Sequence, residues 1–535
     1  MILEETRVRR ILLPFYVLLA LALSALVLRY QYFIGDDGTF YARVGAHLAA
    51  GKGITVDGQE PYLVHPPFYP LLLGVVNLVS HDLEFSGHLV SMLAFSLTVV
   101  PLFFLCRRIY SASTAHWASW LYFTNGFLLI HSNLVMTEAL FIFLVMSLAF
   151  ASHELIQSTR PSIFWAVVTG ILGGLASLTR PEGILFYGAG ILCLFLMREG
   201  SYVPRIRLMS FSSVFFLLFF LPYAFLIHRQ TGHLPVSDAA KELLLIRQRD
   251  VAHPNQYLEV KQFLYGLTED RTTIRLYQLI REFDLLECLR KDRFALLRSF
   301  FPSLINRLLA MNPYLFGGLA FLLMGAAWFH SPWNERRKKS EAFLLLLLLT
   351  LLPQVLGAFM VRRYLIYLTL LLLWEAQGIE AVREWAKTSF RLSARKSVGA
   401  ALGICLFFAS LSAAYLYRTL AHFPMSFETR ELGLWMKRNI PDVGREKVAT
   451  RHPSFNFYSG TPAIWLPYVD QLEDLKSYLA NHQARFFVVS NDLEPPFREA
   501  YRSLLEEAPS LPQGWRLIHR IAGRSKVFLY EVPPP

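Results

Sequence analysis

FLLLLLLTLL, residues 343–352, contains no charged side chain and a single polar one. Comparable apolar runs recur along the chain of 535 residues, which is 54% hydrophobic and only 17% charged. Soluble domains carry about 25% charged residues, and a helix that crosses a bilayer needs about 20 mostly apolar residues. The sequence therefore predicts a mainly α-helical, polytopic membrane protein. Low charge and 43 phenylalanines argue against a disordered chain.

The formal net charge of +12 has a membrane explanation. The basic residues lie mainly in short loops between apolar runs, as the positive-inside rule requires of cytoplasmic loops. We therefore expect the protein to lie in a lipid bilayer, and we do not expect it to bind nucleic acid. Arg7, Arg9 and Arg10 precede a first apolar run without a following cleavage site, which predicts an uncleaved helix with a cytoplasmic N-terminus.

The hydropathy pattern predicts about eleven transmembrane helices. They lie at residues 11–30, 87–105, 114–131, 137–153, 163–178, 184–197, 209–228, 311–329, 342–359, 364–380 and 398–417. Because the number is odd, the C-terminus is expected outside the cytoplasm. The long outer loops are then residues 31–86 and 229–310, and the inner loops are short.

The chain is expected to divide into a membrane domain, residues 1–417, and an extracytoplasmic α/β domain, residues 418–535. Charge rises in the second part, and short β-like runs alternate with helical ones. Strands are predicted at 448–450, 463–466, 485–490 and 526–532, and helices at 428–439, 469–481 and 497–507. In loop 229–310, residues 294–309 suit a helix in the membrane interface.

Adjacent carboxylates, Asp36 and Asp37, follow the first predicted span. They could be two solvated loop acids. Alternatively, partial desolvation at the interface would raise the pKa of one of them and make it a better general base. Glu138 begins a predicted span after Thr137, where it favours the helix N-terminus, although a Glu at this depth is costly without a partner.

Basic and aromatic residues are predicted on the same outer face. Arg180 and the pair Arg363-Tyr364 lie there against the positive-inside trend, so each arginine needs an anionic partner. A phosphate would suit the bidentate guanidinium, and pairing with the acidic residues would also serve. His65 precedes two prolines that fix its backbone, which is compatible with a structural or a site role.

The order of these motifs resembles the GT-C class of polyprenyl-phosphate-sugar-dependent glycosyltransferases. It is most similar to bacterial relatives of the protein O-mannosyltransferases, the lipid A aminoarabinose transferases and the lipopolysaccharide galacturonic-acid transferases. The resemblance covers roughly residues 10–380. It rests on Asp36-Asp37-Gly-Thr-Phe-Tyr41, His65-Pro-Pro-Phe-Tyr-Pro70, Thr137-Glu138, Leu178-Thr-Arg-Pro-Glu-Gly183 and Arg363-Tyr364.

The resemblance implies a catalytic aspartate in the first outer loop. Members that place it four residues before the tyrosine indicate Asp37, and those that place it five before indicate Asp36, so both stay open. Glu138 is implied as the second acidic position. Arg180, Arg363 and Tyr364 are implied near the donor phosphate, and so is His65, which stands where the aminoarabinose transferases have a lysine.

The mechanism implied is a single inverting displacement at the anomeric carbon. An aspartate would deprotonate or orient an acceptor hydroxyl, and arginines would stabilise the departing polyprenyl phosphate. The acceptor could be lipid A, another cell-surface glycan, a lipid or a protein. Three acidic residues on one face leave room for a divalent metal, but nothing sets its ligand geometry, so none is predicted as required. The expected location is the cell membrane.

Two other functions remain open from the sequence. A transporter or lipid flippase would show charged residues at mid-membrane and broken helices in matching halves. The chain has few charges within its spans and no internal repeat. A non-catalytic glycan-binding relative would keep the fold without the acidic residues, which are present here.

Overall fold

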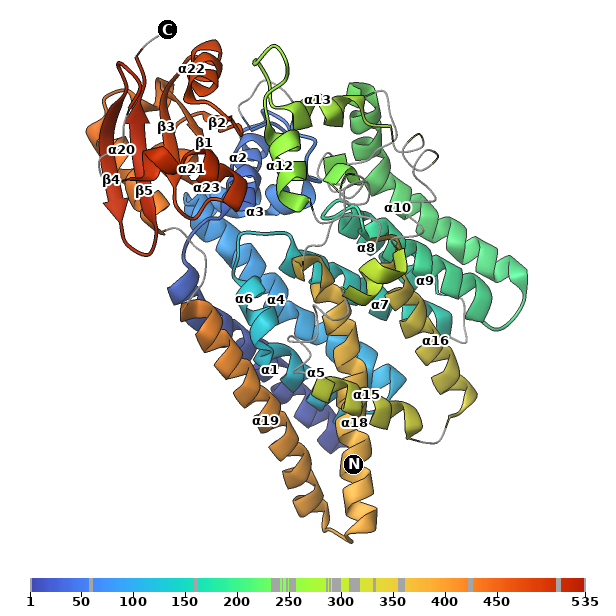
Figure 1. Cartoon of the computed structure of the whole chain (residues 1–535). Coiled ribbons are helices and arrows are strands. Elements are labelled where there is room, and N and C mark those ends of the chain that lie inside the picture. Colours follow the sequence, from blue (N-terminus) through green and yellow to red (C-terminus); the bar gives the residue numbers. More distant parts are fainter. Residues whose placement is uncertain are drawn as a thin grey trace.

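The computed structural model describes residues 2–56, 61–157, 162–231, 256–284, 300–306, 318–330, 333–354, 361–421, 427–506 and 511–533, with a few positions between 241 and 290. Long helices form a bundle, and a sheet domain made by the C-terminal residues sits at one end of it (Figure 1). Six described helices are long and apolar enough to cross a bilayer, and four shorter apolar ones accompany them. The chain is a multi-pass membrane protein of the helical class.

Helices occupy the sites of all eleven predicted spans. They are α1 (Ile2–Gln31), α4 (Leu83–Ile109), α5 (Ala112–Thr124) with α6 (Gly126–Ser132), α7 (Glu138–Gln157), α8 (Ile163–Ser177), α9 (Gly183–Met197), α10 (Tyr202–Thr231), α15 (Leu319–Phe329), α16 (Glu335–Leu349) with α17 (Leu351–Gln354), α18 (Leu365–Ser389) and α19 (Ala394–Ala421). Residues 311–317 and 355–360 of two spans lie outside the described residues. The third span is broken at Asn125, whose side chain accepts the amide hydrogens of Phe127 and Leu128 at 3.1 Å and so starts α6.

Burial separates central from peripheral helices. α18 is buried along most of its length, as are α4 and α7, whereas less than a third of the apolar stretch of α1, α10 and α19 is buried. In a membrane protein such exposed apolar surface faces lipid. Against α18, the carbonyl of Leu323 would lie only 2.0 Å from a side chain at Gly378, so a glycine permits this close helix contact.

The predicted first outer loop, residues 31–86, contains two helices that hydropathy did not predict. They are α2 (Asp36–Ala49) and α3 (Phe68–Ser80). They cross at Gly45 and Gly74, where an added Cβ on Gly74 would lie 2.2 Å from the Gly45 carbonyl oxygen. This contact fixes the angle of α2, which carries both candidate aspartates.

The C-terminal residues form a five-stranded mixed sheet in the order β2-β1-β3-β5-β4. The strands are β1 (Lys447–Thr450), β2 (Ala463–Trp465), β3 (Ala484–Ser490), β4 (Arg516–Ala522) and β5 (Lys526–Glu531). β2, β1 and β3 are parallel, and β5 is antiparallel to both β3 and β4. The four strands predicted from sequence are β1, β2, β3 and β5, and β4 was missed.

Side chains of β3 and β5 alternate between two cores, as the period of two in a strand requires. Phe486 and Val488 belong to one core and Phe487 and Val489 to the other. Helices cover both faces of the sheet: α20 (Phe427–Asn439) and α21 (Pro453–Ser459) contribute to the first core, and α22 (Leu472–Asn481) and α23 (Pro495–Ala500) to the second. The domain also contains two short 3-10 helices, η3 (Val443–Arg445) and η4 (Arg502–Leu505). An α/β domain therefore forms as predicted.

The predicted second outer loop contributes α12 (Tyr257–Tyr265) and α13 (Arg275–Glu282), which lie at the same end of the bundle as the sheet (Figure 1). Most of the interfacial helix predicted at 294–309 lies outside the described residues. Residues 300–306 of it are helical. The backbone of Tyr468 donates to Tyr265 at 2.9 Å, so this loop is tied directly to the sheet domain.

Candidate active site

Asp36 and Asp37 lie in the first turn of α2, where the helix dipole favours negative charge. Successive residues of a helix point about 100° apart, so the two carboxylates face different partners. Gly38 packs tightly below them, because a Cβ there would lie 2.8 Å from the Val135 carbonyl oxygen. The start of α2 is thereby held against the segment that leads into α7.

Asp37 pairs with Arg362 from the 3-10 helix η2 (Val361–Tyr364). Arg362 Nη2 donates to Asp37 Oδ2 at 2.7 Å, and Arg362 Nε lies 3.7 Å from Glu138 Oε1. These residues come from three distant parts of the chain. One guanidinium therefore bridges the carboxylates of α2 and α7.

A second set of contacts continues from Glu138. Arg180 Nη1 donates to Glu138 Oε1 at 3.0 Å and Arg180 Nη2 to Glu182 Oε1 at 3.3 Å. Arg363 Nη1 reaches the same Glu182 oxygen at 3.2 Å. We call the resulting cluster of alternating charges the charge network: it comprises Asp37, Arg362, Glu138, Arg180, Glu182 and Arg363.

The members of the charge network differ in accessibility. Glu138 is 5% exposed, whereas Asp37 and Arg362 are each 32% exposed and Arg363 is 23% exposed. Among the described residues, the accessible rim of the network is thus one carboxylate beside two guanidinium groups. Buried oxygens remain as well, because Glu138 Oε2 and Glu182 Oε2 have no hydrogen-bond partner in the described part of the chain.

The electrostatics keep Asp37 and Glu182 ionised. Burial alone would raise the pKa of Asp37, but the neighbouring Arg362, with a smaller contribution from Arg180, holds that pKa below its ordinary value. Burial likewise opposes ionisation of Glu182, yet Arg180 and Arg363 lower its pKa to about 2. The expectation that desolvation raises the pKa is therefore wrong for Asp37: Arg362 outweighs burial, and Asp37 is a carboxylate at neutral pH.

His65 and Tyr364 lie beside the charge network rather than in it. The His65 ring packs at 5.0 Å from that of Tyr41, and burial lowers the pKa of His65 to about 4, so the imidazole is neutral. Tyr364 is buried, with its ring 6.3 Å from that of Tyr367. Of the predicted donor-phosphate residues, the structure brings Arg180 and Arg363 into one cluster.

Asp36 faces the sheet domain. Its Oδ1 accepts from Ser454 Oγ at 3.1 Å, and His452 Nδ1 lies 3.8 Å from its other oxygen. His452 also lies 3.3 Å from Asp492. Burial would lower the pKa of His452, but hydrogen bonds and charge from Asp36 and Asp492 raise it to about 9. Asp37 thus belongs to the charge network, whereas Asp36 contacts the sheet domain.

Further contacts dock the sheet domain on the first outer loop. Arg43 Nη2 donates to the carbonyls of Asn456 and Thr461, both at 2.9 Å. Tyr458 donates to Glu84 Oε1 at 2.7 Å and accepts the amide hydrogen of Ile34 at 2.9 Å. The helix that carries Asp37 is therefore held from both the membrane side and the sheet side.

Sequence reasoning missed Arg362 and Glu182 as members of the site. Both belong to motifs that the sequence did single out, Arg362 next to Arg363 and Glu182 two residues after Arg180. The signal was present in the motif, but which arginine meets which acid depends on the fold. Within the ranges described, no three His, Cys, Asp or Glu side chains are grouped as metal ligands.

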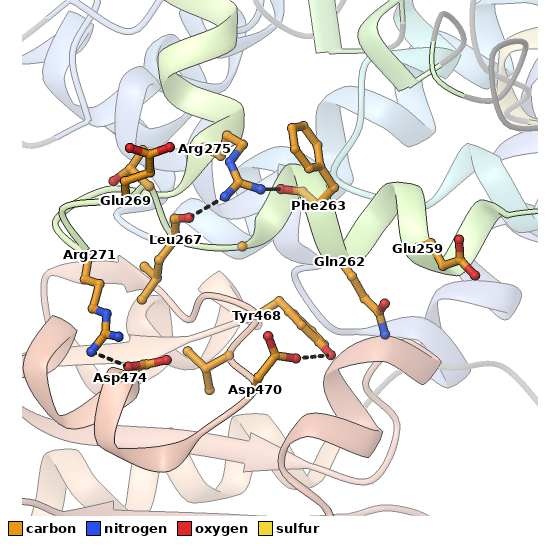
Figure 2. Close-up of a pocket in the computed structure, with 13 residues that line it drawn as sticks. Glu259, Gln262, Phe263, Leu267, Glu269, Arg271, Arg275, Tyr468, Asp470 and Asp474 are labelled. Atoms are coloured by element: carbon orange, nitrogen blue, oxygen red, sulfur yellow. Dashed lines mark hydrogen bonds and ion pairs between the residues drawn. The ribbon is translucent and has the colours of Figure 1, made fainter.

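A polar cavity of about 480 Å³ lies between the second outer loop and the sheet domain (Figure 2). Arg271 Nη1 pairs with Asp474 at 2.7 Å across it, and Tyr468 donates to Asp470 at 3.0 Å. Tyr265 accepts the backbone hydrogen bond from Tyr468 in the sheet domain, and its hydroxyl donates to Glu242 Oε1 at 2.6 Å. The charge of Asp37 helps to raise the pKa of Glu242, after the larger effect of burial, so this loop approaches the charge network.

Comparisons with known proteins agree with this architecture. The family model described as dolichyl-phosphate-mannose-protein mannosyltransferase matches residues 64–226. No curated protein sequence matches the chain. The matched residues 64–226 include the start of α7 and the turn that carries Arg180 and Glu182.

Solved structures show the same fold at low sequence identity. ArnT from Cupriavidus metallidurans in the apo state has a TM-score of 0.58 at 14% identity, covering 96% of this chain and 97% of its own. The oligosaccharyltransferase of Archaeoglobus fulgidus in the apo form has a TM-score of 0.61 at 14% identity, covering 89% of this chain and 69% of its own. The chain has the GT-C membrane fold, and its resemblance to GT-C glycosyltransferases is confirmed.

Proposed function

We propose that this GT-C protein transfers a sugar from a polyprenyl-phosphate donor to a hydroxyl acceptor on the outer side of the cell membrane. The observation that carries the proposal is the accessible rim of the charge network. Asp37, Arg362 and Arg363 combine a carboxylate held ionised with two guanidinium groups that reach solvent. That combination suits a reaction that takes up a proton and releases a phosphate.

The donor phosphate would bind at the arginines of the rim. Arg363 uses one guanidinium nitrogen for Glu182, and a guanidinium has five N–H donors, so capacity remains for phosphate oxygens. Arg180 lies deeper and would add its charge from behind. Support comes from ArnT of Cupriavidus metallidurans, of similar fold, whose structure has been solved with undecaprenyl phosphate.

Asp37 is our candidate for the base. An acceptor hydroxyl attacks the anomeric carbon as its proton passes to the Asp37 carboxylate. The bond from that carbon to the phosphate oxygen breaks, and polyprenyl phosphate leaves with the electron pair. The arginines stabilise the negative charge that develops on it, so no acid has to protonate this leaving group. One displacement inverts the anomeric centre.

The other predicted residues take supporting roles in this proposal. Glu138 would orient Arg180 and Arg362, since it contacts both. Asp36 would anchor α2 to the sheet domain rather than act as a base. The neutral His65 would shape the wall through Tyr41, and Tyr364 would fix the start of α18. A divalent metal is assigned no step, because arginines already neutralise the network's carboxylates.

The geometry is compatible with a glycan, lipid or protein acceptor. We place the working face outside the cytoplasm because the charge network and the sheet domain share one end of the bundle (Figure 1). The basic loops between α4 and α5, and before α16, lie at the other end. The positive-inside rule assigns that other end to the cytoplasm.

The test is transfer from a panel of radiolabelled polyprenyl-phosphate sugars to membrane acceptors. Wild-type protein should move label from at least one donor, and that donor names the sugar. The double variant Asp36→Asn with Asp37→Asn should insert and fold but move none. Equal transfer by wild type and double variant would refute the carboxylate mechanism. Donor flipping without transfer would favour the transporter function instead.

A further inference from the structure

A second site candidate lies at the opposite end of the bundle from the sheet domain (Figure 1). A cavity of about 430 Å³ opens there between the end of α4 and the starts of α5 and α16. α4 has 27 residues, so at 1.5 Å per residue about 40 Å separate this end from the first outer loop. The cavity therefore lies near the other membrane surface. Its charged lining consists of Arg107, Arg108, Arg336, Arg337, Glu380 and Glu384.

The charge of this lining is positive. The lining contains four arginines and two glutamates, and two of the arginines have acidic partners outside it: Arg108 pairs with Glu154 at 2.7 Å and Arg337 with Glu341 at 3.4 Å. Both glutamates are also paired with Arg383, which does not line the cavity: Glu380 at 2.7 Å, and Glu384 in close contact. Arg336 is exposed and pairs with no carboxylate among the described residues; it donates to the Arg108 carbonyl at 3.3 Å. The positive charge of Arg336 is thus available to a ligand.

Two helix N-termini meet the same cavity. Ser111 caps α5 and Asn334 caps α16, and both residues line the cavity. Each cap satisfies one amide, Thr114 N at 3.1 Å and Arg337 N at 2.8 Å. The other amides of a first helical turn have no partner within the helix, and such termini attract anions. Arginine side chains and helix dipoles therefore favour the same ligand charge.

Apolar surface beside the cavity distinguishes a lipid from a soluble anion. His330, which lines the cavity, follows directly after α15. On α15, Phe329 is 91% exposed and Leu322 is 71% exposed. Residues seven apart share one helix face, so these side chains form a strip leading to the cavity. The strip suits acyl chains whose headgroup enters among the arginines.

We infer that this cavity binds the phosphodiester headgroup of an anionic phospholipid of the inner leaflet. Basic cavities between transmembrane helices at the cytoplasmic surface bind such headgroups, and arginine matches phosphate oxygens in a bidentate way. Because the site is separate from the charge network, the inference does not depend on the proposed glycosyl transfer. It concerns structural lipid binding and involves no chemical step.

The test compares lipid retention by native mass spectrometry after reconstitution in phosphatidylcholine nanodiscs doped with phosphatidylglycerol. Wild-type protein should retain phosphatidylglycerol preferentially. Arg336→Glu should weaken this retention about tenfold or more, since a charge-assisted phosphate contact becomes a repulsion. Lys338→Glu is the matched control: Lys338 is exposed, two residues along the same helix, and pairs with Glu335 at 2.7 Å. It should retain the lipid like wild type.

Three outcomes would overturn the inference. Equal retention of phosphatidylcholine and phosphatidylglycerol by wild type would remove the headgroup preference. An equal loss in Arg336→Glu and Lys338→Glu would indicate diffuse surface charge instead of this cavity. Displacement of phosphatidylglycerol by inorganic phosphate alone would indicate a soluble anion as the ligand. Because Arg336 is exposed, its replacement should leave the folded fraction unchanged, which thermal unfolding of the variant checks.

Discussion

Replacement of Arg362 by glutamine should move the acid limb of the pH–activity profile upward. Arg362 contacts Asp37 at 2.7 Å and lowers the pKa of that carboxyl against the effect of burial. A base works only while ionised, so activity falls as the pH drops through its pKa. Without the guanidinium the pKa of Asp37 rises, and activity is lost at a higher pH than in wild type.

The size of the shift follows from the geometry. Opposite charges about 4 Å apart interact by about 4 kcal/mol at an effective dielectric constant near 20. Both side chains are 32% exposed, so solvent and salt screening reduce the interaction to about 2 kcal/mol. At about 1.4 kcal/mol per pKa unit, the acid limb should rise by about 1.5 pH units.

The assay is kcat/KM against pH with a labelled lipid donor in nanodiscs. Arg362→Lys keeps a cation near Asp37 and should recover most of the shift. Arg430→Gln is the matched control, because Arg430 is 31% exposed and lies 3.7 Å from Glu84, outside the charge network. An acid limb that stays in place in Arg362→Gln, or moves equally in Arg430→Gln, would refute the role of Arg362.

Two further predictions concern the donor site and the domain contact. Arg363→Ala should raise KM for the lipid donor about tenfold while changing kcat less, since it removes a phosphate contact and leaves Glu182 paired with Arg180; an unchanged KM would reject the phosphate role. The pKa of His452 is raised to about 9 by Asp36 and Asp492, so its contribution to stability is full below pH 6.5 and is lost as the pH rises to 9. The free energy of unfolding should fall by at most about 3 kcal/mol between pH 6.5 and pH 9. Thermal unfolding of the wild type at several pH values should show this decrease. The same decrease in His452→Gln would contradict the role of His452.

The membrane fold was predictable because length and hydropathy determine it almost alone. Six of the described helices are long and apolar enough to cross a bilayer, and packing changed details such as the break at Asn125. α2 was not predicted because Asp36-Asp37-Gly38 is typical of a loop. Its helix is stabilised by tertiary contacts, with Gly38 against Val135 and Gly45 against Gly74. Such contacts are invisible in a local window.

The sheet domain shows the same limit at single elements. β3 and β5 are hydrophobic enough to be recognised, whereas β4, with Arg516, His519 and Arg520, is a polar edge strand. α21 has a proline at its start and Gly460 at its end, signals that a closer reading of caps would have used.

The site was predictable as a set of residues but not as a set of pairs. Charges next to lipid need partners, so acids and arginines on one face were expected to meet. Asp37 and Arg362 are 325 positions apart, and only the fold shows that Arg362, rather than Arg363, bridges Asp37 to Glu138. The sequence also left Asp36 and Asp37 equivalent. Their different partners suggest the division of roles that we propose.

The most direct test of the central claim compares the single variants Asp37→Asn and Asp36→Asn. The measurement is the rate of sugar transfer from the active lipid donor at saturating concentration, with donor binding measured in parallel. The account predicts that Asp37→Asn binds donor yet loses transfer by at least about a hundredfold, because a general base is removed. Asp36→Asn should keep most of the transfer rate. Full activity of Asp37→Asn, or loss confined to Asp36→Asn, would contradict the account.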